Sequence, residues 1–268
     1  MSKEEKHKIA FSTPLVIIGS GNVATQLAKA FSKKNITIAQ LYSKNKTHAE
    51  KLATHIKCPF TNNIKEIVKG NFIYLICIKD EAIESFCKSF KIKEGILLHT
   101  SGSIDMNILK TSSKNYGVFY PLQTISSNRK ISFKHVPICL EASNQETLDT
   151  IQELARNISK NIHVITSIER KKIHLAAVIV NNFTNHLYHL AFDYLQKEKI
   201  APELLHALIE ETTSKALELN PFEAQTGPAR RNDSNTIKAH QQQLKNNPDL
   251  QKIYTLLSES IIKTYQHE

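Results

Sequence analysis

A glycine-rich segment near the N-terminus carries the most specific chemical signal in the sequence. Residues 19–24 read G-S-G-N-V-A, follow the apolar run Leu15–Ile18 directly and open a helical pattern. In a strand–turn–helix setting, this G-x-G-x-x-G/A spacing lets the backbone approach a pyrophosphate and aims helix N–H groups at it. A glycine-rich turn without a ligand is the less favoured alternative. The residues predicted to hold the pyrophosphate are Gly19, Ser20, Gly21, Asn22 and Val23.

The residues after the second strand-like run distinguish between two dinucleotides. An NAD site usually carries Asp or Glu about 20 residues after the glycine motif. Here the run ends in Tyr42-Ser43-Lys44-Asn45-Lys46, and no carboxylate occurs before Glu50. Ser43 and Lys44 can hydrogen-bond and neutralise a 2′-phosphate, whereas the alternative is that both lysines of the segment are ordinary solvated residues. We therefore predict NADP(H) as the cofactor.

Three polar segments follow later strand-like runs, at the sheet edge where ligands of doubly wound folds bind. The first contains Ile78 and Lys79, which we expect to contact the cofactor. Hydride transfer to a carbonyl or an imine also needs a proton donor. His99 or Tyr120 could donate, and Ser101 could orient the acceptor. His99 is the leading candidate, although a structural strand-end histidine is an equally weighted alternative.

A helical pattern in the second half of the chain carries polar groups on an apolar background. His174, Asn181 and Asn185 are spaced seven and four residues apart and so share one helix face. A buried unpaired amide costs about 1–3 kcal/mol, so these groups need partners in a ligand or in a neighbouring helix. We predict a catalytic role for Asn181 and substrate contacts for His174 and Asn185.

The loop at residues 225–233 is the third candidate region. Its Gly-Pro pair sets a rigid turn, and two arginines beside Asp233 suit either anion recognition or an internal salt-bridged turn. Asp233 or Ser234 could equally cap the following helix. The residues expected to bind substrate are Thr226, Gly227 and Arg230. No metal site is expected, because His186 and His189 lack a third ligand.

Alternating strand and helix patterns must position these groups. Strands are predicted at 15–18, 36–42, 72–78, 96–99, 116–120, 136–140 and 162–165. Helices are predicted between them at 23–31, 47–55, 64–68, 81–90 and 145–158. Such alternation indicates a doubly wound parallel α/β sheet, a Rossmann-type fold. From residue 167 only helices are predicted, at 167–197, 202–219, 234–244 and 248–265. We therefore expect a dinucleotide-binding domain at 1–166 and a smaller all-α domain at 167–268.

Composition narrows the class of protein further. The 268 residues are 41% hydrophobic and 22% charged, with a net charge of +10. These are ordinary globular values, and the scattered lysines make nucleic acid a less favoured partner than an anionic cofactor. The polar first eight residues are not followed by an apolar signal core. We expect a cytoplasmic protein with no membrane association.

Taken together, the segments resemble bacterial predicted oxidoreductases that join a Rossmann-like NADP-binding domain to a helical domain of unknown function. The motifs that carry the resemblance are 19–24, 99–102, 121–124, 174–183 and 226–233. The resemblance implies kinship with pyrroline-5-carboxylate reductases, 3-hydroxyisobutyrate dehydrogenases and deazaflavin-dependent NADP reductases. It also implies a homodimer formed through the helical domain and a small-molecule substrate bound between domains.

Two departures from the family pattern qualify the expected chemistry. Tyr120 stands where the family commonly has His before Pro-Leu-Gln, which weakens an acid role for this position. Ala177 and Val178 stand where hydroxyacid dehydrogenases of the wider group carry a catalytic lysine, which argues against that chemistry. The expected activity is hydride transfer between NADP(H) and a small carbonyl or imine. The alternative is a non-catalytic protein that senses NADP(H).

Overall fold

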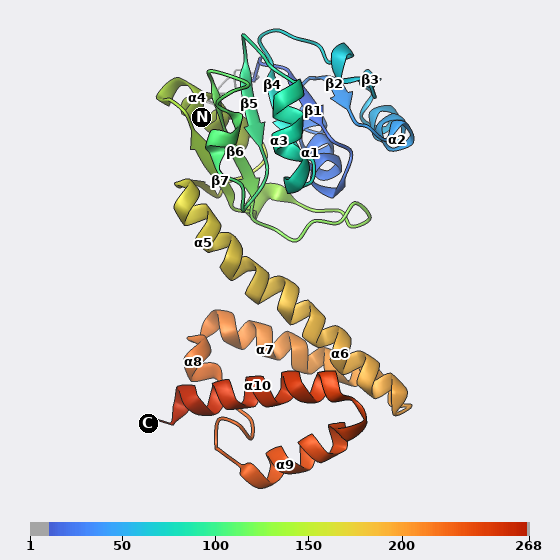
Figure 1. The fold of residues 1–268 in the computed structure, drawn as a ribbon, viewed down its shortest axis with the longest axis vertical. Helices are drawn as coiled ribbons and strands as arrows, with labels where there is room; N and C mark the ends of the chain where they lie inside the picture. Colours follow the sequence, from blue (N-terminus) through green and yellow to red (C-terminus); the bar gives the residue numbers. More distant parts are fainter. Residues whose placement is uncertain (1–10, 267–268) are drawn as a thin grey trace, which may run out of the picture. The chain divides into compact units, whose positions relative to one another are not determined.

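The computed structural model describes residues 11–266, so the polar N-terminal segment lies outside the described residues. The described chain forms two compact units, the first ending at Asn181 and the second starting at Asn182 (Figure 1). The first contains every strand of the described chain, and the second is helical. The predicted α/β class, a Rossmann sheet followed by a smaller all-α region, is confirmed.

The first unit is built on one eight-stranded sheet of order β3-β2-β1-β4-β5-β6-β7-β8. All neighbouring strands are parallel except β6 and β7. The strands are β1 (Leu15–Ile18), β2 (Ile38–Tyr42), β3 (Phe60–Thr61), β4 (Ile73–Ile76), β5 (Ile96–His99), β6 (Tyr116–Pro121), β7 (Ile138–Ala142) and β8 (Ile162–Val164). Since β1 lies between β2 and β4, the winding direction reverses there, and such a switch point opens a crevice at the carboxyl ends of the strands.

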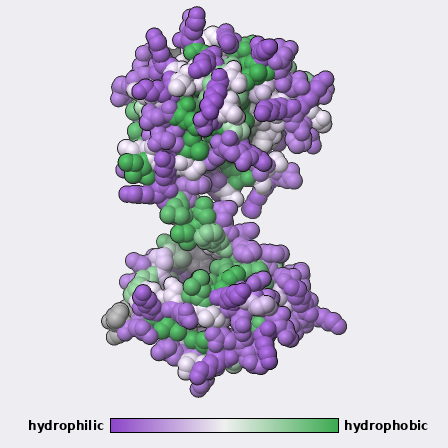
Figure 2. Space-filling model, in the orientation of Figure 1, coloured by the Kyte–Doolittle hydropathy of each residue, from purple (hydrophilic) through white to green (hydrophobic). Residues whose placement is uncertain are grey.

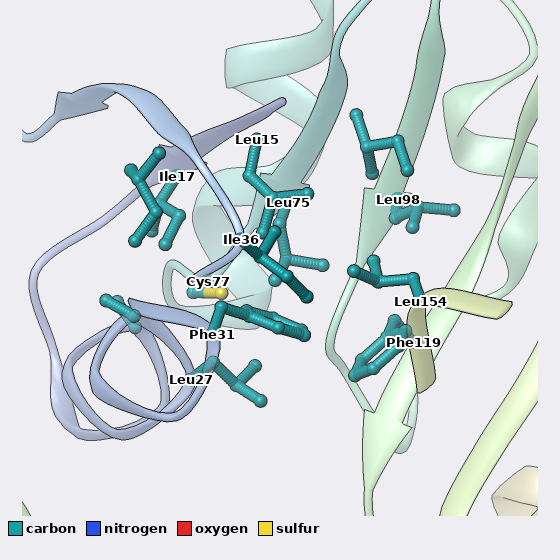
Figure 3. Close-up of a cluster of buried hydrophobic side chains, with 14 of the residues drawn as sticks. Leu15, Ile17, Leu27, Phe31, Ile36, Leu75, Cys77, Leu98, Phe119 and Leu154 are labelled. Carbon is teal, nitrogen blue, oxygen red and sulfur yellow. The ribbon is translucent and has the colours of Figure 1, made fainter. Parts of the chain in front are cut away.

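Helices cover both faces of this sheet because successive residues of each strand point to opposite sides. Leu15 and Ile17 of β1 belong to one buried cluster, and Val16 and Ile18 belong to the other. The first cluster, drawn in Figure 3, packs against α1 (Asn22–Ser32), α2 (Lys46–Ile56) and α4 (Gln145–Arg156). The second packs against α3 (Asp80–Ser89). Both cores therefore fix β1 and the turn that follows it.

Three details of the sheet unit differ from the predicted elements. The two-residue strand β3 was not expected, because it is too short to show a periodic pattern. The predicted helix at 64–68 is a single 3₁₀ turn, η1 (Ile64–Glu66). The pair β6–β7 is antiparallel, since the connection between them holds only the 3₁₀ turn η3 (Phe133–His135) and no crossover helix. A further 3₁₀ turn, η2 (Met106–Leu109), follows β5.

The predicted helix at 167–197 is interrupted. It consists of α5 (Ser167–Ala177), the π-helical turn η4 (Val178–Phe183) and α6 (Thr184–Lys197). Such single π-helical turns are rare within α-helices and often occur at functional sites. No helix in the range 11–266 combines the length and apolarity that crossing a membrane requires.

The second unit is helical and has few buried side chains. After α6 come η5 (Pro202–Leu205), α7 (His206–Glu218), α8 (Pro221–Ala224), α9 (Ser234–Gln243), η6 (Leu244–Asn246) and α10 (Pro248–Tyr265). None of α6, α7 and α8 has a buried residue. Figure 2 shows the resulting apolar side chains at the surface.

Candidate functional site

The glycine loop lies at the switch point and has the geometry that a phosphate-binding turn needs. Gly19 has φ +119°, and a Cβ atom there would lie 2.3 Å from the Cys77 carbonyl oxygen. Its N–H donates to the Tyr42 carbonyl at 2.7 Å, which fixes the turn against β2. Only glycine therefore fits this position.

Gly21 differs from Gly19 because the space around it is empty. A Cβ atom at Gly21 would meet no atom within 4 Å. Gly21 is also the N-cap of α1, and no side chain caps this helix end. The first backbone N–H groups of α1 thus face open space, which is the arrangement that binds phosphate oxygens.

A cavity of about 610 Å³ opens beside this loop, within the size range of small-molecule sites. Seven of the predicted cofactor residues line it: Gly19, Ser20, Gly21, Ser43, Lys44, Ile78 and Lys79. Its other lining residues come from the ends of β2 and β4, from η1 and from α3, and none of the lining residues is Asp or Glu. The cavity fits an anionic dinucleotide because its lining contains two lysines and no carboxylate, and because the space at Gly21 is empty.

The end of β2 places the predicted 2′-phosphate residues on the cavity wall. Ser43 is buried, and its Oγ is hydrogen-bonded to the Ser20 Oγ at 2.8 Å. Lys44 follows as an exposed cation, and Asn45 caps α2 by accepting from the His48 N–H at 3.0 Å. A hydroxyl and an ammonium group therefore stand where NAD-binding proteins usually place a carboxylate.

Asn22 and Val23 do not line the cavity with their side chains. Val23 packs against the first buried cluster, so only its backbone could serve a phosphate. Asn22 Oδ1 accepts from the Ser127 N–H at 3.1 Å. One turn further on, the Gln26 side chain donates to the carbonyls of Ser126 and Arg129, both at 2.8 Å. These contacts hold the β6–β7 connection against α1.

Ser101 is fully engaged by its neighbours. Its Oγ donates to the Asp80 carboxylate at 2.8 Å and accepts from the backbone N–H groups of Ser103 and Ile104 at 3.1 and 3.0 Å. Ser103 Oγ donates to the same carboxylate oxygen at 2.5 Å. Because a hydroxyl has one donor and two acceptor sites, this geometry favours a positioning role for Ser101 over the expected contact with substrate.

His99 is completely buried at the end of β5. Its Nδ1 accepts from the Ser101 N–H at 3.2 Å, so the neutral ring carries its proton on Nε2. Burial and, to a smaller extent, the nearby Arg170 guanidinium lower the pKa of His99 to about 3, while Asp80 opposes the shift. A neutral, inaccessible imidazole argues against the expected role as proton donor and favours the structural alternative.

This burial predicts a pH dependence of stability that His99→Asn should reduce. The unfolded state binds a proton at His99 below its reference pKa of about 6.5, whereas the folded state does so only near pH 3. The contribution to the free energy of unfolding is therefore complete above pH 6.5 and falls by up to about 1.4 kcal/mol per pH unit below it. The free energy of unfolding, measured by urea titration at several pH values from 7 to 4, should fall less steeply with decreasing pH in His99→Asn than in the wild type. An equal pH dependence in both proteins would contradict this assignment.

Tyr120 and His174 form a hydrogen-bonded pair of half-buried side chains in the first unit. The Tyr120 hydroxyl lies 3.2 Å from His174 Nδ1, and their rings meet edge to face at 6.1 Å. Both side chains are half-buried, and burial raises the pKa of Tyr120 above its usual value. A Cβ atom at Gly102 would lie 2.5 Å from His174 Nδ1 and 2.9 Å from Tyr120 Cζ. The glycine thus allows the pair to close over the backbone after β5.

A buried ion pair between Arg170 and Glu141 fixes the start of α5. Arg170 is completely buried and donates to the Ser101 carbonyl at 2.9 Å and to Glu141 Oε2 at 3.1 Å. Glu141 also accepts from the Ser167 N–H and Oγ, at 2.8 and 2.9 Å. Charged residues are rarely buried unless they are paired, so an exposed Arg170 is the default expectation and the sequence gives no sign of this pair.

The three polar residues of the long helical segment lie in different environments. His174 is in α5 with Tyr120, Asn181 lies in the π-turn η4, and Asn185 is exposed on α6. A π-turn inserts one residue into the helical repeat. The predicted common face of these residues is therefore wrong across η4, because it assumed an uninterrupted α-helix.

The loop at 225–233 is organised by contacts within the second unit. The Arg230 guanidinium lies 4.1 Å above the Tyr265 ring, which in turn stacks on Phe222 at 4.5 Å. Gly227 has φ +99°, and the Thr226 carbonyl accepts from the Gln225 side chain at 2.9 Å.

The end of this loop starts α9. Asp233 caps the helix by accepting from the Thr236 N–H and Oγ1, at 3.1 and 2.7 Å. These hydrogen bonds hold the pKa of Asp233 below its usual range. The capping alternative is thus the one that the structure favours for Asp233. Among the described residues there is no group of three or more potential metal ligands.

Two protein families match the sequence. Residues 14–101 match the family described as NADP oxidoreductase, coenzyme F420-dependent, and residues 136–261 match a domain of unknown function, DUF2520. The comparison with curated proteins gave no match.

Solved structures resemble nearly the whole chain. A "putative NADP oxidoreductase" from Bacteroides fragilis is 39% identical with a TM-score of 0.88, over 95% of this chain and 99% of that chain. A reductive aminase from Aspergillus terreus, in complex with NADPH4, cyclohexanone and allyl amine, has a TM-score of 0.68 at 13% identity, over 95% and 94%. A 1-pyrroline-5-carboxylate reductase from Streptococcus pyogenes has a TM-score of 0.59 at 12% identity, over 93% and 98%. At these low identities the last two show similarity of fold alone.

Proposed function

Because this chain belongs to the NADP oxidoreductase family that pairs a Rossmann-like domain with a DUF2520 domain, we propose that it transfers a hydride between NADP(H) and a small carbonyl or imine. The family resemblance predicted from the motifs is confirmed. The observation that carries the proposal is the cavity at the switch point, which is lined by the glycine loop and by Ser43 and Lys44 and contains no Asp or Glu.

NADP(H) is the cofactor of this family, and the residues present fit it. Gly19 and Gly21 with the start of α1 would hold the pyrophosphate, and Ser43 and Lys44 the 2′-phosphate. Ile78 and Lys79, at the end of β4, would contact the remaining part of the dinucleotide. When bound, NADPH would supply the hydride for reduction while the protein supplies the proton; in the reverse direction the protein would accept that proton.

We assign that proton to Tyr120. Its hydroxyl is half-buried, and His174 Nδ1 at 3.2 Å can take up or return the proton through the imidazole. The Asp80–Ser101–Ser103 network and the Arg170–Glu141 pair hold the backbone around Gly102 in place. His99 acts within this frame as a buried hydrogen-bonding residue.

The remaining site residues predicted from the sequence keep their proposed roles. Asn181 would orient the substrate, and Asn185, Thr226, Gly227 and Arg230 would bind it. Arg230 would do so with its guanidinium group, which lies 4.1 Å above the Tyr265 ring. The domain bounds that we propose from the change of sequence pattern are residues 1–166 and 167–268, whereas the compact units divide between Asn181 and Asn182.

Replacement of Tyr120 by Phe tests the assignment of the proton donor. Removing a general acid typically lowers kcat by about 10²–10⁴-fold. We expect this loss in oxidation of NADPH by a panel of cyclic imines, ketones and aldehydes, with an unchanged NADPH dissociation constant. His99→Asn serves as the control and should retain most of its activity. Full activity of Tyr120→Phe would overturn the assignment. Absence of turnover by the wild type across the panel would favour the sensor alternative.

We also propose that the second unit forms a homodimer. Large apolar side chains on its helices are more than half exposed, among them Phe183, Leu204, Leu208, Leu217 and Leu256. Monomeric proteins rarely leave extensive apolar surface in contact with water, so a second copy of the same helices is the natural cover. Sedimentation equilibrium should give twice the mass of the chain, and a monomer at micromolar concentration would contradict this.

A further inference from the structure

A second cavity of the sheet unit lies at the opposite end of α1 from the glycine loop. It has a volume of about 570 Å³ and lies at the C-terminal ends of α1 and α4 and beside η3. An 11-residue helix is about 16 Å long, so this cavity is separate from the cofactor cavity. The two cavities have no lining residue in common.

The wall of this cavity carries an unusual concentration of positive charge. Six of its thirteen lining residues are cationic, and none is Asp or Glu: the six are Lys33, Lys34, Lys130, Lys134, Arg156 and Lys160. None of the six takes part in an ion pair with a carboxylate of the described chain. Cations at helix C-termini are stabilised by the helix dipole, which accounts for Lys33 and Arg156. It does not account for Lys130 and Lys134, which come from the β6–β7 connection.

The backbone that carries these cations is fixed by hydrogen bonds. The Gln26 side chain holds the carbonyls of Ser126 and Arg129, immediately before Lys130. Ser159 Oγ donates to the Val136 carbonyl at 2.7 Å, and the Lys160 N–H donates to the Lys134 carbonyl at 3.0 Å. The charges from α1, α4 and η3 therefore surround one preformed hollow.

An apolar floor lies among the cations. Phe133 and Ile158 are buried, and Ala30 and Ile131 are half-buried. A hollow of several hundred cubic ångströms with an apolar floor and convergent polar groups is typical of small-molecule sites. Extended nucleic acid is favoured instead by a stripe of positive charge with exposed aromatic side chains, and the one aromatic residue of this lining, Phe133, is buried.

We propose that this cavity binds a small organic polyphosphate, an anion with two or more phosphate groups, at the same time as the cofactor cavity binds NADP(H). The cations bind the phosphates, and the apolar floor contacts the organic part. A molecule that carries phosphate charge alone uses only the first of these contacts.

Calorimetric titration of the NADPH-saturated protein with inorganic tripolyphosphate tests the proposal, because the cofactor cavity is then filled. We expect saturable binding that weakens as the salt concentration rises. The double variant Lys33→Gln/Lys134→Gln should lose about tenfold in tripolyphosphate affinity. The control Lys51→Gln/Lys69→Gln removes the same charge from exposed positions outside the cavity and should stay within about twofold of the wild type.

Comparison of two probes identifies the ligand class. We expect a nucleoside triphosphate to bind more tightly than tripolyphosphate, because the apolar floor contacts its organic part, and equal affinities would overturn the assignment of an organic ligand. The proposal of a binding site is overturned if tripolyphosphate does not bind, or if both double variants lose tripolyphosphate affinity equally. Tighter binding of a duplex oligonucleotide, lost in Lys33→Gln/Lys134→Gln, would overturn the small-ligand assignment. Repeating the titration in Gly21→Asp without NADPH makes the answer independent of cofactor binding.

Discussion

Gly21→Asp should weaken NADPH binding by about a hundredfold or more, because like charges placed in contact cost several kcal/mol. The new carboxylate would stand at the N-cap of α1, where the proposed pyrophosphate binds. The same substitution should leave the folded protein intact. The φ of Gly21 is −76°, a Cβ atom there meets nothing within 4 Å, and Asp is a favourable N-cap residue. We expect the free energy of unfolding to stay within about 0.5 kcal/mol of the wild-type value.

Gly21→Asn is the matched control for this experiment, since it has nearly the same shape as Asp without the charge. It should retain more NADPH affinity than Gly21→Asp, and the difference between the two measures the electrostatic part of the effect. Calorimetry for binding and urea titration for stability give both quantities on the same samples. Wild-type NADPH affinity in Gly21→Asp would place the pyrophosphate elsewhere.

Arg170→Met should lower the free energy of unfolding by about 3–5 kcal/mol, because it leaves the Glu141 carboxylate without its cation. The substitution also removes the hydrogen bond to the Ser101 carbonyl and so loosens the backbone between His99 and Gly102. We therefore expect a lower kcat along with the loss of stability. Denaturant unfolding and steady-state kinetics at a temperature well below the transition measure the two effects.

Two further variants separate the buried ion pair from its surroundings. Lys171→Met removes the neighbouring, exposed pair with Asp105, whose atoms lie 3.4 Å apart, and should cost less than about 1 kcal/mol. The double variant Arg170→Met/Glu141→Leu removes both charges and should be more stable than Arg170→Met alone. A loss below about 1 kcal/mol in Arg170→Met would show that the pair does not anchor α5.

The cofactor cavity follows from local sequence patterns. A strand, a glycine turn and a helix are contiguous in the chain, and parallel strands bring their carboxyl ends to one edge. Residues as distant as Gly19, Ser43 and Lys79 could therefore be assigned to one cavity from the order of elements alone. The same logic predicted that the segments at 99–102 and 120–124 would follow neighbouring strands.

The remaining features depend on contacts between residues far apart in the sequence. The Tyr120–His174 and Arg170–Glu141 pairs join residues 54 and 29 positions apart, and no periodicity signals either. The π-turn escaped prediction because helical periodicity averages over several turns and does not show one inserted residue. Residue type and strand-end position, which are visible in a sequence, make His99 the leading acid, whereas its complete burial and the resulting low pKa are not visible there.

The most direct test of the central claim is the comparison of NADPH and NADH affinities of the wild-type protein by isothermal titration calorimetry. Ser43 and Lys44 at the end of β2, with no carboxylate in the cavity wall, predict micromolar binding of NADPH and binding of NADH at least about tenfold weaker. Equal affinities would contradict the assignment of the 2′-phosphate to these residues. Absence of binding by either dinucleotide would contradict the proposed oxidoreductase function of the cavity itself.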